Sequence, residues 1–360
     1  MYDVAIAGLG PAGRALAHRC AVHGLRVLAI DPHPDRAWAP TYGAWTDELP
    51  SWLPDVAAAR VAEPAAFTVR LHRLAREYQV FDNAALRPAL NLTGVTVRAA
   101  HLDGLGPLAD QARIVIDARG AIGGAAEQTA YGLVLPRSVA APALDGAAAW
   151  FMDWRADNGT APGDPPSFLY AVPTGPDTML LEETCLVGRP ALDLSILADR
   201  LTTRLAARGV AGSDGRVERV RFPVDAPRRR GAFGARGGFV HPGTGYSVAA
   251  ALAAADPVAA ALAQSRATDR TLVDRALWSY RARAVHRLRR LGLRSLLELA
   301  PEQVVPFFAA FLDLPIARQR AYLSGRHDLV GVLTAMVTLA RSLPPDLLRV
   351  LARSASLGQD

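Results

Sequence analysis

Lysine is absent from this sequence of 360 residues, so all 40 basic residues are arginines. Schiff-base catalysis and the Walker-type phosphate loop both depend on a lysine, and both are therefore excluded. Cysteine is nearly absent, because Cys20 and Cys185 are the only two and lie far apart. This scarcity excludes a disulfide framework and a cysteine-rich zinc site, and we predict no metal centre.

Long apolar runs are also missing. The longest, Leu329–Ala340 and Val304–Leu312, are much shorter than a membrane-spanning helix. Residues 1–7 have the pattern of a strand rather than that of a charged and then apolar leader. We therefore expect a cytoplasmic protein that does not cross a membrane.

Apolar residues make up 51% of the chain, and the formal net charge is +6. The apolar content excludes a disordered or fibrous protein, and the length suffices for one large domain or two modest ones. The positive charge is compatible with nucleic-acid binding, with an anionic membrane surface, or with arginines at solvated positions. The last interpretation is the default unless the arginines cluster.

The N-terminus carries a dinucleotide-binding pattern. A short apolar strand over Val4–Ala7 leads into the sequence GLGPAG, and an alanine-rich helix is expected from Arg14. A second strand over Arg26–Ile30 ends in Asp31. Strand, glycine turn, helix, strand and acid in this order favour a functional dinucleotide clamp over a chance glycine turn.

Each residue of this clamp has a physical role. Gly8 permits the tight turn, Gly10 lets a pyrophosphate approach the backbone, and Gly13 allows the helix to pack closely on the strand. The helix N-terminus faces the phosphates, and Asp31 accepts from a ribose hydroxyl. An acid at this position favours NAD or FAD over NADP.

A second glycine-rich loop, Gly237–Tyr246, opens another alanine-rich helix over Ser247–Ala255. We predict that Asp256 and Pro257 break this helix before it continues to Ala263. A glycine loop at a helix N-terminus forms a cradle for an anion or a carbonyl group.

Two such cradles favour FAD, whose pyrophosphate and isoalloxazine need separate supports. A strand over Arg113–Ile116 also ends in an acid and a glycine. His241 is expected to be a packed loop residue rather than a catalyst. The candidate cofactor-binding residues are Gly8, Gly10, Gly13, Asp31, Asp117, Gly120, Gly238, Pro242, Gly243, Thr244, Gly245 and Tyr246.

Two pairs of acidic residues lie near aromatic residues. Glu182 and Glu183 fall on a predicted strand, so they point to opposite faces and cannot both enter one site. A carboxyl group in an apolar pocket would keep its proton and act as a general acid. Asp47 and Glu48 follow Trp45, which predicts either an active-site wall or a loop anchored by the tryptophan. Two surface glutamates at a strand end remain the alternative for the first pair.

The C-terminal third is predicted to be helical. Over Trp278–Leu299, six arginines alternate with leucines, which is typical of a basic amphipathic helix. Such a helix suits an anionic membrane surface, and the alternative is a packed helix with an arginine-rich solvent face.

Motifs along nearly the whole chain resemble those of the lycopene cyclase family, the FAD-dependent carotenoid cyclases of plants, cyanobacteria and bacteria. The matching segments are GLGPAG at Gly8–Gly13, TYGAWTDE at Thr41–Glu48, IDARG at Ile116–Gly120, QTAYG at Gln128–Gly132, FMDWR at Phe151–Arg155, SFLYAVP at Ser167–Pro173, LLEETCLVGRP at Leu180–Pro190, GGFVHPGTGYSVA at Gly237–Ala249, FFAAFLDL at Phe307–Leu314 and YLSGR at Tyr322–Arg326. The segment Phe222–Pro227 departs from the plant pattern, because it lacks the usual glycine pair.

The resemblance implies an α/β fold of the p-hydroxybenzoate hydroxylase type, with a Rossmann-like FAD-binding domain, a mixed-sheet substrate domain and a helical C-terminal part. We expect the FAD-binding domain to comprise residues 1–46, 72–128 and 223–265. The substrate domain would comprise residues 47–71 and 129–222, and the helical region residues 266–360.

The resemblance also implies an activity. Lycopene cyclases close the acyclic ends of lycopene by protonation and carbocation chemistry, without net redox change, and they need reduced FAD with NADPH or NADH as reductant. By similarity, Glu182 is the proton donor, Glu183 orients it or pairs with an arginine, and Asp47 and Glu48 are secondary acid or base candidates. The expected substrate-pocket residues are Tyr42, Trp45, Phe151, Trp154 and Tyr170.

The expected partners are a lipophilic carotenoid and the inner face of the cytoplasmic membrane, with no nucleic acid. Three alternatives stay open: a flavin monooxygenase or oxidoreductase of the same fold, a cyclase of another terpenoid or polyene, and a non-enzymatic arginine-rich binding protein. The ring type and the number of ends closed also stay open.

Overall fold

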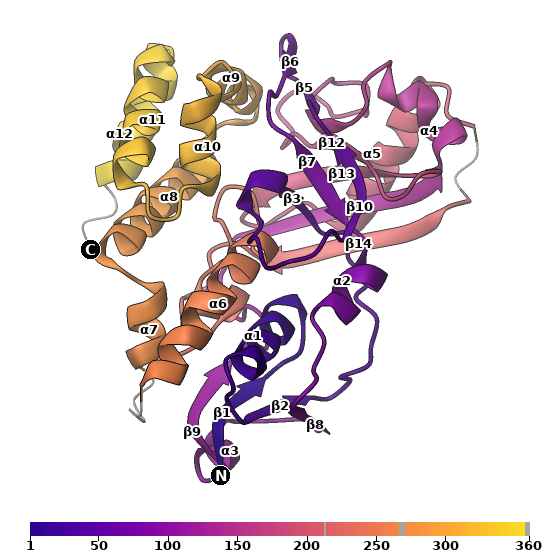
Figure 1. Ribbon diagram of the computed structural model, residues 1–360. Helices are drawn as coiled ribbons and strands as arrows, with labels where there is room; N and C mark the ends of the chain where they lie inside the picture. Colours follow the sequence, from indigo (N-terminus) through magenta and orange to yellow (C-terminus); the bar gives the residue numbers. More distant parts are fainter. Residues whose placement is uncertain (212–213, 266–270, 357–360) are drawn as a thin grey trace.

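The computed structural model describes residues 1–211, 214–265 and 271–356. The predicted start of the helical region at residue 266 and its end at residue 360 lie outside the described residues. Figure 1 shows a lower part built on a small parallel sheet, an upper part built on a larger sheet, and helices along one side of both.

The lower part contains a four-stranded parallel sheet in the order β8-β2-β1-β9. Its strands are β1 (Tyr2–Ala7), β2 (Val27–Asp31), β8 (Val95–Ala99) and β9 (Ala112–Asp117). In the register, Ala7 lies opposite Ile30 on one side and Asp117 on the other. The carboxyl ends of β1, β2 and β9 therefore meet at one edge, and the predicted Rossmann-like arrangement is confirmed.

Helix α1 (Pro11–Val22) packs on this sheet, and α6 (Val248–Gln264) packs against α1. The start of α1 differs from the prediction, since it begins at Pro11 and not at Arg14. Proline fits the first position of a helix, where its missing N–H needs no partner. The glycine turn therefore leads directly into the helix.

The predicted break in α6 is wrong, because the helix continues through Asp256 and Pro257. A proline inside a helix costs about 3 kcal/mol. That cost is offset by tertiary contacts, since Leu252 and Val258 are fully buried, and each such burial contributes about 1.5–3 kcal/mol. Asp256 also forms an ion pair with Arg19 of α1 at 2.5 Å.

The upper part is a seven-stranded mixed sheet in the order β14-β10-β13-β12-β11-β5-β6. Its strands are β5 (Ala65–Phe67), β6 (Leu71–Arg73), β10 (Glu127–Pro136), β11 (Trp150–Asp153), β12 (Phe168–Pro173), β13 (Thr178–Gly188) and β14 (Arg216–Pro223). A three-stranded sheet lies beside it, with β3 (Gly43–Trp45), β4 (Ala57–Val61) and β7 (Tyr78–Phe81).

Helices cover both faces of the larger sheet. The outer face packs against α4 (Arg137–Leu144) and α5 (Leu194–Ala207), and the inner face meets the C-terminal helices. Those helices are α8 (Tyr280–Glu298), α9 (Pro301–Leu312), α10 (Ile316–Ser324), α11 (Leu329–Ser342) and α12 (Pro345–Ser356), whereas α7 (Thr271–Leu277) packs against α6 in the lower part. Two short helices, α2 (Asn83–Ala89) and α3 (Gly106–Ala109), and the 3₁₀ segments Thr46–Glu48 and Gly234–Gly237 complete the fold.

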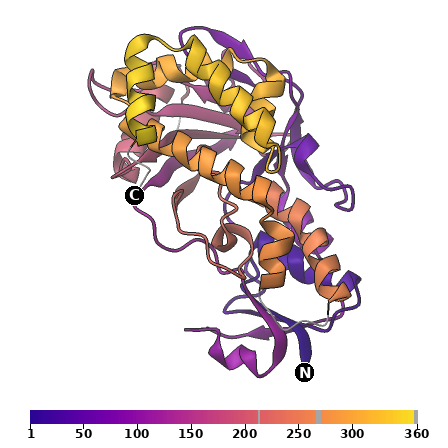
Figure 2. The ribbon, with the colours of Figure 1, turned by 90° about the vertical axis from the view of Figure 1, so that its left-hand side faces the viewer.

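Figure 2 shows the long helix α8 running from α7 in the lower part to α11 and α12 in the upper part. It contacts α11 and α12, and Leu293 on its apolar side is buried against Ala126 and Val224. Arg281, Arg283 and Arg287 are exposed, whereas Arg289 is buried. The protein itself therefore covers the apolar side of the predicted amphipathic helix. None of the described helices has the length and apolar character that a membrane crossing needs.

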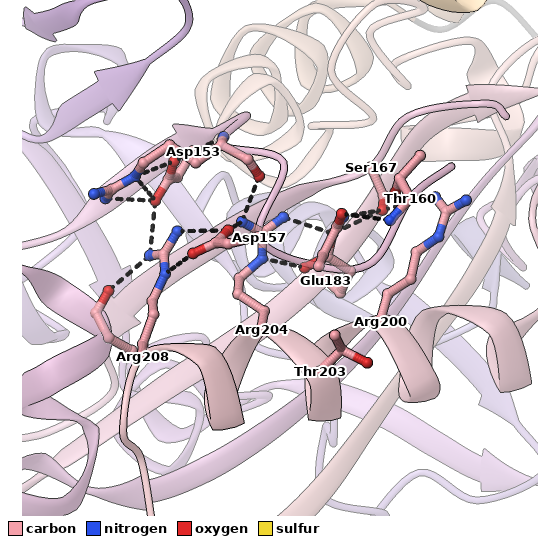
Figure 3. A network of polar contacts seen from close by, with 12 residues as sticks. Asp153, Asp157, Thr160, Ser167, Glu183, Arg200, Thr203, Arg204 and Arg208 are labelled. Atoms are coloured by element: carbon pink, nitrogen blue, oxygen red, sulfur yellow. Dashed lines mark hydrogen bonds and ion pairs between the residues drawn. The ribbon is translucent and has the colours of Figure 1, made fainter. Parts of the chain in front are cut away.

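An ion-pair network joins α5 to the outer face of the larger sheet (Figure 3). Glu183 of β13 is 0% exposed, and Arg204 donates to both of its oxygens at 2.8 and 3.0 Å. Asn158 and Ser167 each donate to Oε1 of Glu183 at 2.7 Å. Arg204 also pairs with Asp157. Glu183 is therefore fully satisfied on this face of the sheet.

Replacing Arg204 should destabilise the fold strongly. Arg204→Met leaves the buried Glu183 without its cation, and breaking a buried pair in this way costs about 3–5 kcal/mol. Urea unfolding of the purified protein measures this change in the free energy of unfolding. The matched control is Arg73→Met, at an exposed position of β6, which should change stability by less than about 0.5 kcal/mol. Equal unfolding midpoints for the two variants would contradict a stabilising role of the network.

Candidate active site

A cavity of about 590 Å³ lies between the inner face of the larger sheet, the C-terminal helices and the second glycine loop. The helices contribute an apolar wall that includes Phe307, Phe308, Phe311, Met336 and Leu339. The loop residues Gly243–Val248 close the opposite end. The cavity thus extends from the second glycine loop to an apolar wall formed by the C-terminal helices. Two acidic side chains of the larger sheet lie between these ends.

Glu182 is the acidic residue of β13 that lines this cavity, and it is only 7% exposed. Its Oε1 accepts a hydrogen bond from the Thr184 hydroxyl at 3.0 Å, and no ion pair to it is found among the described residues. Burial, and then the negative charge of Glu218, raises the pKa of Glu182 to about 8. A carboxyl group with such a pKa is protonated at neutral pH and can donate its proton.

Glu218 of β14 is a second acidic residue in the cavity wall, and it is 5% exposed. The Thr41 N–H donates to its Oε1 at 2.6 Å, and the Thr41 hydroxyl donates to its Oε2 at 2.7 Å. Glu218 was not predicted as a site residue, because an acid between arginines on a strand has the pattern of a solvated face.

The other predicted acidic residues lie elsewhere. Glu183 points to the outer face of the sheet, as strand alternation requires, and does not line the cavity. Asp47 and Glu48 line a separate cavity of about 620 Å³. Asp47 pairs with Arg76 at 2.5 Å, and burial raises the pKa of Glu48, which accepts from the Ser324 hydroxyl.

Three of the five predicted pocket aromatics line the same cavity as Glu182: Tyr42, Phe151 and Tyr170. Trp45 instead lines the second cavity, and Trp154 packs between Phe168 and Phe308 in the core. The helix phenylalanines that form the far wall were noticed in the sequence only as part of a family motif.

A cluster of three tyrosines also meets at the cavity, and the sequence analysis missed its centre, Tyr78. The Tyr78 hydroxyl lies 2.9 Å from that of Tyr170 and donates to that of Tyr246 at 2.8 Å. Burial raises the pKa of all three hydroxyls well above the usual range, so they stay neutral. Their electron-rich rings and neutral dipoles suit a site in which positive charge develops.

The first glycine turn is shaped for a phosphate group. Gly8 has φ +100°, and a side chain on Gly13 would clash with the Gly8 carbonyl oxygen. Beside Gly10 there is open space, and no side chain caps the N-terminus of α1. Asp31 accepts from the Leu9 N–H at 2.8 Å, which fixes the turn. Free N–H groups facing open space at a helix start are what a pyrophosphate needs.

The second glycine loop places another uncapped helix N-terminus, that of α6, at the cavity. Gly245 has φ +76°, and a side chain there would collide with Phe222 and Gln128. The neighbouring loop residues Gly243, Thr244 and Tyr246 line the cavity, and Pro242 lines the second one. Together, the two loops fit the two ends of FAD.

The remaining predicted cofactor residues have clear structural roles: Asp117 pairs with arginine, and the two glycines occupy turns. Burial would raise the pKa of Asp117, but hydrogen bonds and charge from Arg119 lower it below its usual value. Gly120 and Gly238 adopt φ +91° and +86°, which favours glycine at both turns. His241 is buried in its loop, where its Nδ1 accepts from the Gly243 N–H at 3.1 Å.

Neither cysteine nor a metal cluster contributes to the site. Cys20 and Cys185 are both buried and unbridged, and burial raises the pKa of Cys20 to about 12. Within the part of the chain that the structure describes, no group of three or more metal-ligating residues is close enough to hold a metal ion.

Two solved structures show the same fold. A geranylgeranyl bacteriochlorophyll reductase-like protein from Thermoplasma acidophilum gives a TM-score of 0.66 at 13% identity, covering 98% of this chain and 99% of the other. A variant of the halogenase PltM in complex with FAD gives 0.58 at 14% identity, covering 99% and 91%. These likenesses confirm the predicted p-hydroxybenzoate hydroxylase-type fold.

Sequence comparison identifies the family. The model described as "Lycopene cyclase protein" matches residues 3–52 and 72–344. An "uncharacterized carotenoid cyclase" of Deinococcus radiodurans is 36% identical over 98% of this chain and 90% of its own length. A lycopene beta cyclase of Synechococcus elongatus is 29% identical over 96% and 94%. The chain belongs to the lycopene cyclase family.

Proposed function

We propose that this protein is an FAD-dependent lycopene cyclase that closes the acyclic end or ends of lycopene, or of a related carotene, to β-type rings. The observation that carries the proposal is the buried carboxylic acid Glu182, which lines an apolar cavity next to the second glycine loop and forms no ion pair among the described residues. Protonation of an alkene needs a dry acid that still holds its proton at neutral pH, and the pKa of about 8 meets that need.

The reaction requires no net oxidation. The O–H bond of Glu182 breaks, and its proton forms a C–H bond at the terminal double bond of the polyene, which leaves a tertiary carbocation. A neighbouring alkene then supplies the electron pair of the new ring bond, and loss of a proton restores a double bond. The Tyr78, Tyr170 and Tyr246 cluster lies where its rings can stabilise the positive charge.

FAD would be held by Gly8, Gly10, Gly13 and Asp31 at the first turn and by the Gly243–Tyr246 loop at the cavity. When bound in its reduced form, FAD would supply an electron-rich ring that stabilises positive charge, and NADPH or NADH would be the reductant. The apolar helix wall would exclude water from the cation, which water would otherwise quench.

A flavin monooxygenase or related oxidoreductase of the same fold is the alternative. Such an enzyme consumes NAD(P)H and oxygen in proportion to product, whereas a cyclase needs only catalytic reductant. Cyclisation of another polyene would leave lycopene unchanged.

Expression in a lycopene-accumulating bacterium tests the activity. The wild-type chain should convert lycopene to cyclic carotenes, identified by chromatography and mass spectrometry. In Glu182→Gln the cyclisation rate should fall at least 100-fold, because this variant lacks the general acid. The variant should keep its flavin, since Glu182 is no part of the FAD loops. Unchanged lycopene with the wild-type chain would contradict the function, and a wild-type rate in Glu182→Gln would contradict the assignment of the acid.

Cyclisation should also depend on pH in a defined direction. The protonated form of Glu182 is the active one, so the rate of the FAD-reduced enzyme should fall as the pH rises from 7 through about 8. Initial rates in a buffered micellar assay measure this limb. A rate that rises with pH over the same interval would contradict an acid at this position.

A membrane contact is part of the proposal, because the substrate is lipophilic. We place that contact on α11 rather than on α8, whose apolar side is covered. Val330, Leu333 and Val337 form an exposed apolar stripe on α11, with Val330 74% exposed. Met336 and Leu339, on the same helix, line the cavity. One helix therefore separates the cavity from an apolar outer surface.

Flotation with phosphatidylglycerol-containing vesicles tests this surface. Changing Val330, Leu333 and Val337 together to serine should lower the bound fraction about tenfold or more, because each apolar side chain buried in lipid contributes about 1 kcal/mol. The control changes Arg281, Arg283 and Arg287 to glutamine, which should have the smaller effect. Equal flotation of the serine variant and the wild type would place the contact elsewhere.

A further inference from the structure

Two carboxylates lie on one face of the sheet with only a glycine between them. In the register, Gly132 of β10 lies opposite Glu182 of β13 on one side and Glu218 of β14 on the other. Residues opposite each other on paired strands share a face. The row continues to β12, where Tyr170 lies opposite Glu182. All the side chains of this row therefore point into the cavity.

Gly132 makes the approach of the two carboxylates possible. A Cβ atom added at Gly132 would lie 2.8 Å from Cδ1 of Leu180, 3.1 Å from Cβ of Glu182 and 3.3 Å from its Cγ, so these two side chains share the space above the glycine. Adjacent strands are about 4.8 Å apart, which allows side chains two strands apart to converge over a residue without a side chain. The pairing of β10 with β13 and β14 therefore brings the two carboxylates onto the same face of the sheet.

The two carboxylates differ in their hydrogen bonds. Both oxygens of Glu218 accept from Thr41, from its N–H and its hydroxyl. Only one oxygen of Glu182 accepts a hydrogen bond from the described residues. A carboxylate whose two oxygens both serve as acceptors favours the charged form, and a buried carboxyl with a free oxygen favours the neutral one. Of the two, Glu182 is therefore the one whose surroundings favour the protonated form.

We propose that Glu218 is a second catalytic residue, the base that accepts the proton lost when the ring double bond forms. This inference rests on the proposed cyclase function and deepens it. Glu182 gives its proton to the polyene and becomes a carboxylate. The C–H bond next to the ring cation then breaks, its electron pair forms the ring double bond, and the proton forms an O–H bond on Glu218. Transfer of that proton back to Glu182 restores the starting state, with no redox change.

Among the described residues that line the cavity, the polar groups other than these two carboxylates do not supply a base. Tyr170 and Tyr246 are neutral hydroxyls in a mutual hydrogen-bond network with Tyr78. The arginines in the wall have other partners: Arg221 pairs with Glu127 at 2.7 Å, and Arg219 lies over the ring of Tyr131. Among the described residues that line the cavity, Glu182 and Glu218 are the acidic ones.

The test compares Glu218→Gln and Glu218→Asp in the full chain with bound FAD. Glutamine keeps the volume and an oxygen that accepts from Thr41, but it removes the base, so the cyclisation rate should fall at least 100-fold. Aspartate keeps the base in a displaced position and should restore part of the rate. The alkaline limb of the residual rate should move to lower pH in Glu218→Gln, because loss of the neighbouring negative charge lowers the pKa of Glu182. It should stay in place in Glu218→Asp.

Two controls separate the possible failures. Thr41→Val removes only the hydroxyl donor and should change the rate by a few-fold, and Glu63→Gln, at an exposed position, should leave it unchanged. A Glu218→Gln rate within threefold of wild type, with an unmoved pH limb, overturns the role of Glu218 and leaves that of Glu182 intact. Should Glu218→Gln lose its flavin, a flavin-bound Glu218→Asp variant without measurable cyclisation overturns it instead, because that variant keeps the carboxylate. Absence of cyclic product with the wild-type chain would remove the proposed function itself.

Discussion

The site depends on the alternation of side chains along β13, which sends two neighbouring glutamates into opposite environments. Glu183 enters a network of arginines on the outer face, where Arg204 and two neutral donors satisfy it. Glu182 enters the apolar cavity on the inner face, where it meets a hydroxyl and a like charge. The buried ion pair fixes the strand against α5, and this fixed strand holds the neutral acid in position. A shift of one residue in register would exchange the two environments.

The second constraint is the position of α6, which links the two halves of the protein. Its N-terminus and the preceding glycine loop lie at the cavity, and its body packs against α1, whose own N-terminus faces the first glycine turn. A long cofactor with an anionic centre and a carbonyl-bearing ring can therefore contact both helix starts. The packing of α6 against α1 also explains why Pro257 is tolerated inside the helix. The free energy gained from this packing exceeds the cost of a proline in a helix interior.

Local geometry was predictable from the sequence, and long-range pairing was not. The GLGPAG turn, the acid at the end of β2 and the opposite faces of Glu182 and Glu183 follow from neighbouring residues. Glu218 becomes part of the site only through the pairing of β14 with β10, which no local pattern encodes. The apolar side of α8 was predictable, but its cover was not, because α11 and α12 come from later in the chain. Asp47 and Glu48 had a suggestive pattern, yet Arg76 and the fold place them at another cavity.

The acidic residues show how one fold assigns different chemistry to one functional group. Burial alone would raise the pKa of Asp153, but hydrogen bonds and charge from Arg155 and Arg208 bring it below its usual value, so this group is held as an anion. Glu182 is also buried from solvent but has no arginine partner among the described residues, so desolvation dominates and the proton stays. The chain has arginine in abundance, and the cavity wall next to Glu182 is built from tyrosine, phenylalanine and glycine instead. Among the described residues, the lack of an arginine paired with Glu182 therefore separates this acid from the structural carboxylates, and the arginines of the cavity wall have other partners.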